Sequence, residues 1–384
     1  MRVDKVPVAE PHKKKLLFIS HNATRTGAPL LLLAFISWLR KSSQVEIAVL
    51  FRESGELVEE FAILTKVYIW PPATAPRSRF ANALARFRLR SQIIREKFSF
   101  VYSNTSVNGE ILSWLRGFFT GPIVTHVHEL RHTVECFGEK NWRQVVSCSN
   151  RFVASSPAVV RFLQSAGIGA ENIVLNPYFA DMHGPVKPGA PQQRKEVLTI
   201  GAAGTIEWRK GADLFLQLAA MIRRRAPKLA VRFLWVGGPT YGPDWERVAF
   251  DRRKLLLEKA VHFTGYERNP SRFYSEMDVF TLTSREEPFG IVALEAAMAG
   301  VPTVCFRDAG GMEDFVRGGA GVAVPYLDLE KMADEIIALA RSPKRRQGIV
   351  QVAQKKIANS HMLEQFVARF LQLLEKLARK EPNE

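Results

Sequence analysis

The chain has 384 residues, which is longer than one hydrophobic core usually grows, so we expect two domains. Hydrophobic residues make up 47% of the sequence and charged residues 24%, which excludes a chain that is disordered over most of its length. Lys and Arg outnumber Asp and Glu by 54 to 38, and the resulting charge of +16 favours an anionic partner such as nucleic acid, a lipid surface or a phosphorylated substrate.

The first half of the chain alternates short apolar runs with helical patterns. Strands are expected at residues 14–22, 45–52, 98–104, 122–130 and 151–156, and a Leu-rich helix is expected from Pro29. This alternation predicts parallel strands joined by crossover helices. Residues 166–196 become rich in proline and lose their apolar periodicity after Phe179, so we interpret them as a linker.

The same alternation begins again after the linker. Strands are expected at residues 197–204, 231–238, 261–266, 278–284 and 301–306, with helices at 212–225 and from Gly290. The last helix, roughly 362–379, carries its apolar residues at helical spacing. We therefore predict two doubly wound α/β domains, 1–180 and 181–361, followed by a C-terminal helix and tail at 362–384 that packs back on the N-terminal domain.

One helical segment is unusually basic. Residues 77–97 hold seven basic side chains and one acid, with Phe80, Leu84, Phe87 and Ile94 close to one helical face. A basic amphipathic helix can lie on an anionic membrane surface. The alternative is a solvated helix whose apolar side faces the core of its domain.

Targeting signals are weak in this sequence. The apolar run after Lys13–Lys15 is too short for a signal-peptide core, and the longest run, 30–39, is half the length that spans a bilayer. Three scattered cysteines, Cys136, Cys148 and Cys305, offer no disulfide framework or zinc pattern. We expect a cytoplasmic protein that can sit on the inner face of the cell membrane.

The most informative stretch runs from Glu287 to Glu295. A strand ending near Thr283 leads through a loop into a helix that starts around Phe289 or Gly290, at the carboxyl edge of the sheet. Such a helix start binds phosphate through its backbone N–H groups, and Gly290 lets the ligand approach closely. Two carboxylates flanking a phosphate site suit a ligand with hydroxyls at both ends, whereas a capping acid and a surface glutamate are the alternative.

This stretch resembles the paired-glutamate signature of retaining glycosyltransferases of family 4 (glycosyl transferases group 1), which have the GT-B fold of two Rossmann-like domains facing a central cleft. The resemblance implies that Glu287 holds hydroxyls of the donor sugar and that Glu295 binds the ribose. It also implies that the backbone at Phe289, Gly290, Ile291 and Val292, beside Ser284, reaches the diphosphate and the sugar.

Further matches to this family lie upstream. Residues 201–215 resemble its strand, loop and helix, which places Arg209 and Lys210 opposite the diphosphate. Thr205 stands after Gly204 where many relatives have arginine, so Arg209 takes over that role or the phosphate clamp is weaker. The remaining donor-binding positions that the resemblance implies are Gly27, Ala28, Gly238, Gly265 and Tyr266.

Two histidines lie at the end of the strand expected at 122–130. His126, His128 and Glu129 do not have the spacing of a helical zinc motif, so a metal is not expected. By resemblance, His128 matches the active-site histidine next to the donor sugar. Asn104 and Thr105, in a loop at the same sheet edge, are predicted with His126 to contact the acceptor.

Together these features predict a metal-independent, retaining hexosyltransferase without a cofactor. Its donor is a nucleoside diphosphate sugar, with UDP-glucose as first guess, and its acceptor is a glycan or lipid-linked acceptor in cell-envelope or exopolysaccharide synthesis. We predict that His128, Arg209, Lys210 and Glu287 carry the catalysis. A nucleotide-sugar 2-epimerase of the same fold is the alternative, and a nucleic-acid-binding protein is a remote one because no aromatic stacking platform is interleaved with the basic residues.

Overall fold

The computed structural model describes residues 14–43, 45–71, 79–180 and 197–379. Parts of the predicted linker (181–196), of the predicted basic helix (77–78) and of the expected tail (380–384), as well as Lys13, lie outside the described residues. By its contacts the chain divides into two compact units. The first comprises Met1–Val127 and Val134–Val153, and the second comprises His128–Thr133 and Ala154–Glu384.

The first sheet has seven strands in the order β3-β2-β1-β4-β5-β6-β7. The register pairs β1 with β2 and β4, β2 with β3, and β4 with β5, in each case in parallel. Its strands are β1 (Lys15–Ser20), β2 (Glu46–Phe51), β3 (Lys66–Ile69), β4 (Phe100–Ser103), β5 (Ile123–Val127), β6 (Arg151–Ala154) and β7 (Ile173–Leu175). Continuous apolar runs such as Leu16–Ile19 are buried because helices cover a parallel sheet on both faces.

Helices follow most strands of this sheet. They are α1 (Gly27–Ser42), α2 (Val58–Leu64), α3 (Arg79–Glu96), α4 (Gly109–Arg116), α5 (Arg131–Cys136), α6 (Glu139–Cys148) and α7 (Pro157–Ser165), with 3₁₀ turns at Ser106–Asn108 and Ala170–Asn172. The linker prediction was wrong over its first part, because the 3₁₀ turn and β7 occupy it. Ile173–Leu175 is too short to show periodicity, and only pairing at the sheet edge makes it a strand.

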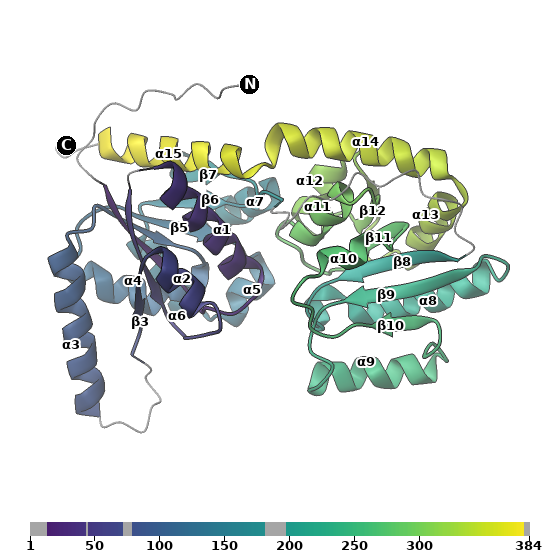
Figure 1. Ribbon diagram of the computed structural model, residues 1–384, viewed down its shortest axis with the longest axis horizontal. Coiled ribbons are helices and arrows are strands. Elements are labelled where there is room, and N and C mark those ends of the chain that lie inside the picture. Colours follow the sequence, from purple (N-terminus) through teal and green to yellow (C-terminus); the bar gives the residue numbers. More distant parts are fainter. Residues whose placement is uncertain (1–13, 44, 72–78, 181–196, 380–384) are drawn as a thin grey trace. The chain divides into compact units, whose positions relative to one another are not determined.

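The second sheet has six parallel strands in the order β10-β9-β8-β11-β12-β13 (Figure 1). They are β8 (Leu198–Ala203), β9 (Val231–Val236), β10 (Val261–Phe263), β11 (Val279–Leu282), β12 (Thr303–Phe306) and β13 (Val322–Val324). The core of this unit joins α8 (Ala212–Arg225) and α13 (Leu329–Arg341) to these strands around Phe215, Phe233 and Trp235. Because β8 and β11 are neighbours, the loops that follow them meet at one sheet edge.

The helices of the second unit run to the end of the described chain. They are α8 (Ala212–Arg225), α9 (Pro243–Lys254), α10 (Ser271–Tyr274), α11 (Ile291–Met298), α12 (Gly311–Val316), α13 (Leu329–Arg341), α14 (Pro343–Ser360) and α15 (Leu363–Arg379), with a 3₁₀ turn at Trp208–Lys210. In α15 the predicted apolar face is buried, and Phe366 packs against Phe179 with ring centroids 5.1 Å apart. The last helix therefore packs on a segment that the sequence assigned to the N-terminal domain.

Among the described residues, none of the helices is long and apolar enough to cross a membrane. Helix α3 lies at the margin of the first unit (Figure 1). It buries Leu89 and Ile93, whereas Leu84, Phe87 and Ile94 are exposed. Three of the four apolar residues that the sequence singled out therefore do not face the core, and the side chain of Phe80 lies outside the described part of the chain.

Candidate functional site

Glu287 lies in the loop between β11 and α11 and is buried, with 6% of its surface exposed. Its carboxylate accepts a hydrogen bond from Lys210 Nζ at 2.5 Å and another from Ser284 Oγ at 3.0 Å. Lys210 is 77 residues away in the sequence, and the adjacency of β8 and β11 brings the two loops together. The two candidate catalytic residues therefore form one buried ion pair.

The backbone of Glu287 is held as firmly as its side chain. Its N–H donates to the carbonyl of Ala309 at 2.6 Å, and its carbonyl accepts from the N–H of Gly311 at 3.1 Å. These bonds tie the loop after β11 to the loop after β12. These bonds fix the loop that carries the carboxylate, and a side chain that positions a ligand needs such a rigid support.

The electrostatics keep this carboxylate charged. Burial by itself raises the pKa of Glu287, but the charges of Lys210 and Arg209 and the hydrogen bonds from Lys210 and Ser284 outweigh it. The net result is a pKa below the usual value of 4.5. Glu287 is therefore an acceptor of hydrogen bonds at neutral pH, and not a proton donor.

Gly211 shapes the turn that carries Lys210. Its φ of +71° is left-handed, and a Cβ atom added there would lie 2.1 Å from the carbonyl oxygen of Thr283. Thr283 in turn donates its hydroxyl to the carbonyl of Gly211 at 2.9 Å. Only glycine allows this approach of the Lys210 loop to the end of β11.

Gly290 opens helix α11 in the left-handed conformation, with φ of +91°, and its lack of a side chain leaves the helix start without a side-chain cap. No acidic residue stands in the first turn. The N–H groups of a helix start and its positive dipole end favour an anion. Ile291 and Val292 are half-buried there, and a Cβ atom added to Gly290 would lie 3.3 Å from Cγ of Glu287.

Glu295 is half-buried on the same helix, and its partner is Tyr274. The Tyr274 hydroxyl donates to Glu295 Oε2 at 2.7 Å, and the tyrosine side chain is fully buried. Burial and the adjacent carboxylate raise the pKa of Tyr274 far above 10, so the phenol stays protonated and keeps donating. The second glutamate is therefore oriented by a residue that the sequence did not single out.

Arg209 points to the neighbouring loop. It donates to the carbonyl of Glu286 at 2.9 Å and to the Glu207 carboxylate at 2.7 Å. Arg285, which the sequence did not single out, forms a two-bond ion pair with Asp213 at 2.9 and 2.6 Å and lies over the Trp208 ring at 4.8 Å. The sequence offered one signal for Arg285, because it stands in a run of three charged residues, 285–287, that ends in Glu287.

His128 is linked to the loop of α11 through aromatic contacts. It stacks on Tyr178 with ring centroids 5.3 Å apart, and its Nδ1 is hydrogen-bonded to the Tyr178 hydroxyl. Tyr178 also packs edge-on against Phe289 at 5.6 Å, and Phe289 contacts His361 at 5.2 Å. The structure therefore brings His128 and the Glu287 loop into one cluster.

The other predicted donor positions of this unit lie at the carboxyl ends of β8, β9 and β10. Gly204 and Thr205 follow β8, Gly238 follows β9, and Gly265 and Tyr266 follow β10. Thr205 and Tyr266 are exposed, and Gly265 bridges to Gly237. These loops share one sheet edge with Lys210 and Glu287, where open parallel sheets bind ligands.

The predicted positions of the first unit divide into two kinds. Gly27 is exposed at the start of α1, with Ala28 beside it. Asn104, Thr105 and His126 are at most 3% exposed. Asn104 donates to the Ala28 carbonyl at 3.0 Å, and His126 Nδ1 is 2.7 Å from the Tyr102 hydroxyl. Burial lowers the pKa of His126 to about 3, so its imidazole is neutral.

Within the part of the chain that the structure describes, no group of three or more His, Cys, Asp or Glu side chains is arranged to hold a metal ion. His126, His128 and Glu129 therefore do not form such a group. Three groups described above lie together instead: the Lys210 ammonium, the Glu287 carboxylate and the uncapped start of α11. It can bind an anionic group and a hydroxyl side by side.

Comparison with known proteins bears on this arrangement directly. Residues 194–342, which include both glutamates and the Lys210 loop, match the family described as glycosyl transferases group 1. Residues 194–342 belong to that family. This confirms the membership that the paired glutamates predicted.

Curated proteins similar to this chain include two D-inositol 3-phosphate glycosyltransferases. The protein of Corynebacterium urealyticum is 32% identical over 165 residues, which is 41% of this chain and 38% of that protein. The protein of Kribbella flavida is 26% identical over 300 residues, or 70% of each chain. The chain thus spans less than half of the first relative's length.

Solved structures share the fold over nearly the whole chain. Anabaena Alr3699/HepE in complex with UDP-glucose gives a TM-score of 0.78 at 20% identity, over 94% of this chain and 99% of that one. Sucrose-phosphate synthase from Thermosynechococcus elongatus gives 0.77 at 17% identity, over 96% and 100%. The prediction of a GT-B fold with two parallel-sheet α/β domains is confirmed.

Proposed function

We propose that the protein is a retaining hexosyltransferase whose donor is a nucleoside diphosphate sugar. The observation that carries this proposal is the buried Lys210–Glu287 pair beside the uncapped start of α11. A carboxylate that stays ionised accepts hydrogen bonds from the hydroxyls of a sugar. The backbone N–H groups of the helix start can bind a diphosphate. The family of residues 194–342 supports the same assignment.

Lys210 supplies positive charge to the leaving group. An ammonium has three N–H donors, and only one of them is directed at Glu287 in the structure. The others can donate to a diphosphate oxygen, where negative charge develops as the bond to the anomeric carbon breaks. With the helix dipole, this charge takes the place of a divalent cation, so we propose a metal-independent reaction in which transfer persists in the presence of EDTA.

Retention of configuration follows from a front-face displacement. The acceptor oxygen bonds to the anomeric carbon on the side that the diphosphate leaves, and the leaving oxygen takes the acceptor proton. Glu287 holds the donor sugar, and His128, placed by Tyr178, faces the same cluster. Glu295, oriented by Tyr274, binds the ribose.

UDP-glucose is our first choice of donor, and a glycan or lipid-linked acceptor of envelope or exopolysaccharide synthesis is our choice of acceptor. The structures of Anabaena Alr3699/HepE with UDP and with UDP-glucose support this donor. The test offers radiolabelled UDP-, GDP- and dTDP-sugars one at a time and measures slow hydrolysis and protection against heat. The proposal fails if none of them binds or turns over.

A residue test accompanies this assay. Glu287→Gln keeps the shape and a neutral acceptor, and we expect a loss of about ten-fold in donor turnover, because a charge-assisted hydrogen bond to the sugar becomes a neutral one. Glu276→Gln, an exposed glutamate of the same unit, is the control. Unchanged turnover in Glu287→Gln contradicts the role of this residue. Formation of a 2-epimer without any acceptor would identify an epimerase.

We also propose that α3 rests on an anionic membrane surface. Leu84, Phe87 and Ile94 are 43%, 65% and 49% exposed, and Arg88 and Arg95 lie on the same helical face. Arginines beside exposed apolar side chains suit an interface of lipid headgroups. Arg86 and Arg90 are structural instead, because they lie over the rings of Trp70 and Phe118 at 4.6 and 5.0 Å.

Flotation with vesicles made of equal parts phosphatidylcholine and phosphatidylglycerol tests the surface. Each arginine near an anionic surface contributes about 1 kcal/mol, so Arg88→Gln with Arg95→Gln should weaken binding about 30-fold. Arg224→Gln with Arg253→Gln removes the same charge from exposed positions of the second unit and serves as the control. Equal flotation of both double variants contradicts a role for α3.

A further inference from the structure

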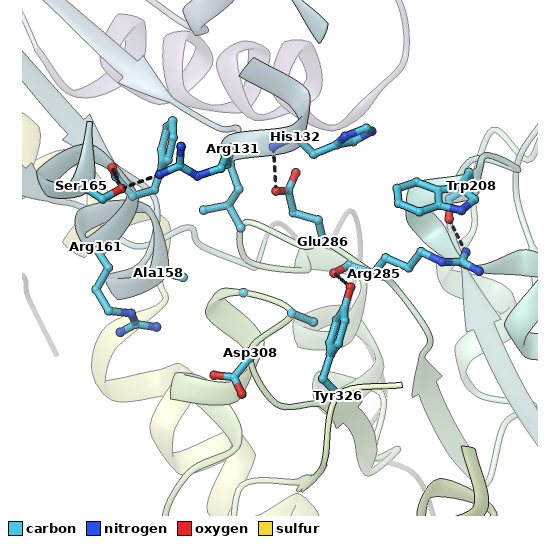
Figure 2. Close-up of a pocket in the computed structure, with 14 residues that line it drawn as sticks. Arg131, His132, Ala158, Arg161, Ser165, Trp208, Arg285, Glu286, Asp308 and Tyr326 are labelled. Carbon is cyan, nitrogen blue, oxygen red and sulfur yellow. Dashed lines mark hydrogen bonds between the residues drawn. The ribbon is translucent and has the colours of Figure 1, made fainter. Parts of the chain in front are cut away.

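A cavity of about 570 Å³ lies at the carboxyl edge of the second sheet (Figure 2). The loops after β11, β12 and β13 contribute Arg285, Glu286, Asp308 and Tyr326, and Trp208 comes from the Lys210 turn. Helices α5 and α7 form the opposite wall, with Arg131, Arg161 and Ser165. All fourteen lining residues belong to the second compact unit, and the volume falls in the range of small-molecule sites.

Two charged side chains of the lining, Glu286 and Arg285, are bonded to other parts of the protein. Glu286 accepts from the backbone N–H groups of His132 and Thr133 at 3.0 and 3.4 Å, which caps the start of α5. Arg285 is held by Asp213 and donates to the carbonyl of Trp208 at 2.7 Å. These groups fix the shape of the cavity.

Two other charges point at the space itself. Arg161 is 60% exposed and forms one ion pair, with Asp314 at 3.2 Å, so most of its five N–H donors face solvent. Asp308 is exposed, its φ of +56° is left-handed, and no hydrogen bond or ion pair joins its carboxylate to another described residue. Figure 2 shows both side chains at the rim of the cavity, with Asp308 below Arg161.

Two aromatic rings complete the lining. Trp208 is 56% exposed and Tyr326 is 46% exposed, which is unusual for side chains of this size. The apolar face of a sugar ring packs well on such platforms, while its hydroxyls need an acceptor such as Asp308 and an anionic substituent needs a guanidinium. The lining thus matches a hydroxylated ring that carries a phosphate or a carboxylate.

We propose that this cavity binds the acceptor and that the acceptor is a sugar or polyol bearing a phosphate or carboxylate group. The proposal rests on the hexosyltransferase function given above. The cavity adjoins the proposed donor site through both of its loops, because Glu286 precedes Glu287 and Trp208 lies two residues before Lys210. A ligand in the cavity therefore lies at the same sheet edge as the Lys210 and Glu287 loops.

The transfer step balances in this arrangement. The acceptor hydroxyl oxygen forms a bond to the anomeric carbon, and the bond from that carbon to the diphosphate oxygen breaks with its electron pair on the diphosphate. The hydroxyl proton moves to that oxygen. Arg161 and Asp308 position the acceptor and take no part in the bond changes.

Calorimetric titration of the full chain tests the proposal with glucose 6-phosphate, glucuronate and glucose, each with and without saturating UDP. We expect at least one charged probe to bind about ten-fold or more tightly than glucose, because a hydrogen bond between charged groups is worth more than a neutral one. UDP should not compete. Arg161→Gln should remove the preference for the charged probe, and Arg161→Lys should retain part of it. Asp308→Asn should weaken the binding of all three sugars.

Arg247→Gln, which removes another exposed arginine paired with an acid, is the matched control and should change nothing. The proposal is overturned if no charged probe binds while UDP does, if UDP displaces the probe, or if Arg161→Gln binds it like the control. Failure of UDP and of every nucleotide sugar to bind, with the charged probes still bound through Arg161, would overturn the hexosyltransferase function and leave an anion site.

Discussion

Lys210→Met is the sharpest test of the site's electrostatics. Methionine preserves the length of the side chain and removes the ammonium group, so Glu287 keeps Ser284 as its hydrogen-bond donor and loses its closest charge. The Lys210 side chain is 16% exposed and that of Glu287 is 8% exposed, so solvent screens the pair little. Removing one partner of a buried ion pair costs about 3–5 kcal/mol, and we expect the free energy of unfolding to fall by that amount at pH 7.

The cost should depend on pH in a defined direction. In the native protein the pKa of Glu287 is lowered, so the stability from the pair is present above the ordinary value of 4.5 and is lost as the pH falls through the folded value. In Lys210→Met burial prevails and raises the pKa, so the carboxylate takes up a proton more easily. The stability difference between the two proteins should therefore shrink from pH 7 to pH 5.

Urea unfolding followed by circular dichroism at both pH values measures these differences. The double variant Lys210→Met with Glu287→Gln should recover much of the loss, because no buried charge is left unpaired. Arg272→Met, which removes the 63% exposed partner of Glu267, is the control and should cost less than about 1 kcal/mol. A Lys210→Met cost no larger than the control, or one that the double variant does not reduce, would refute the reasoning.

Three further predictions concern Tyr274, Gly211 and, for comparison, Gly348. Tyr274→Phe removes the hydrogen bond to Glu295, so we expect a loss of about 1.5–3 kcal/mol in stability and weaker UDP binding by calorimetry; unchanged affinity would separate Glu295 from the ribose. Gly211→Ala should cost at least about 2 kcal/mol, because its Cβ meets the Thr283 carbonyl at a left-handed φ. Gly348→Ala, in the exposed middle of α14 with open space around it, should instead stabilise by about 0.5–1 kcal/mol, and thermal melts of both decide the comparison.

Much of the fold could be predicted from local patterns. The buried runs of β1, β2, β8 and β11 are continuous and apolar, and their alternation with helices specifies parallel sheets. The helix expected at 77–97 is present as Arg79–Glu96. The strand β7 was missed because three residues carry no periodicity, and its existence depends on the sheet edge beside it.

The candidate site shows the same division. The spacing of Glu287 and Glu295 around Gly290 was visible in the sequence because it lies within one strand, loop and helix. The hydrogen-bond partners of these glutamates could not be identified from the spacing. Lys210 and Tyr274 contact them only because of strand order and helix packing. Asp308 and Arg161 share one cavity although 147 positions separate them, and no local pattern connects them.

The sequence by itself determined the two α/β domains, the glycine-opened helix with its paired glutamates, and the basic character of α3. Only the tertiary structure decided which face of α3 is exposed, because Leu89 with Ile93 and Leu84 with Phe87 are both helically spaced apolar pairs and packing chooses between them. It also placed His126 in the interior and Lys210 on Glu287. Burial and long-range pairing arise from the arrangement of whole elements, and residue order specifies them only through the complete fold.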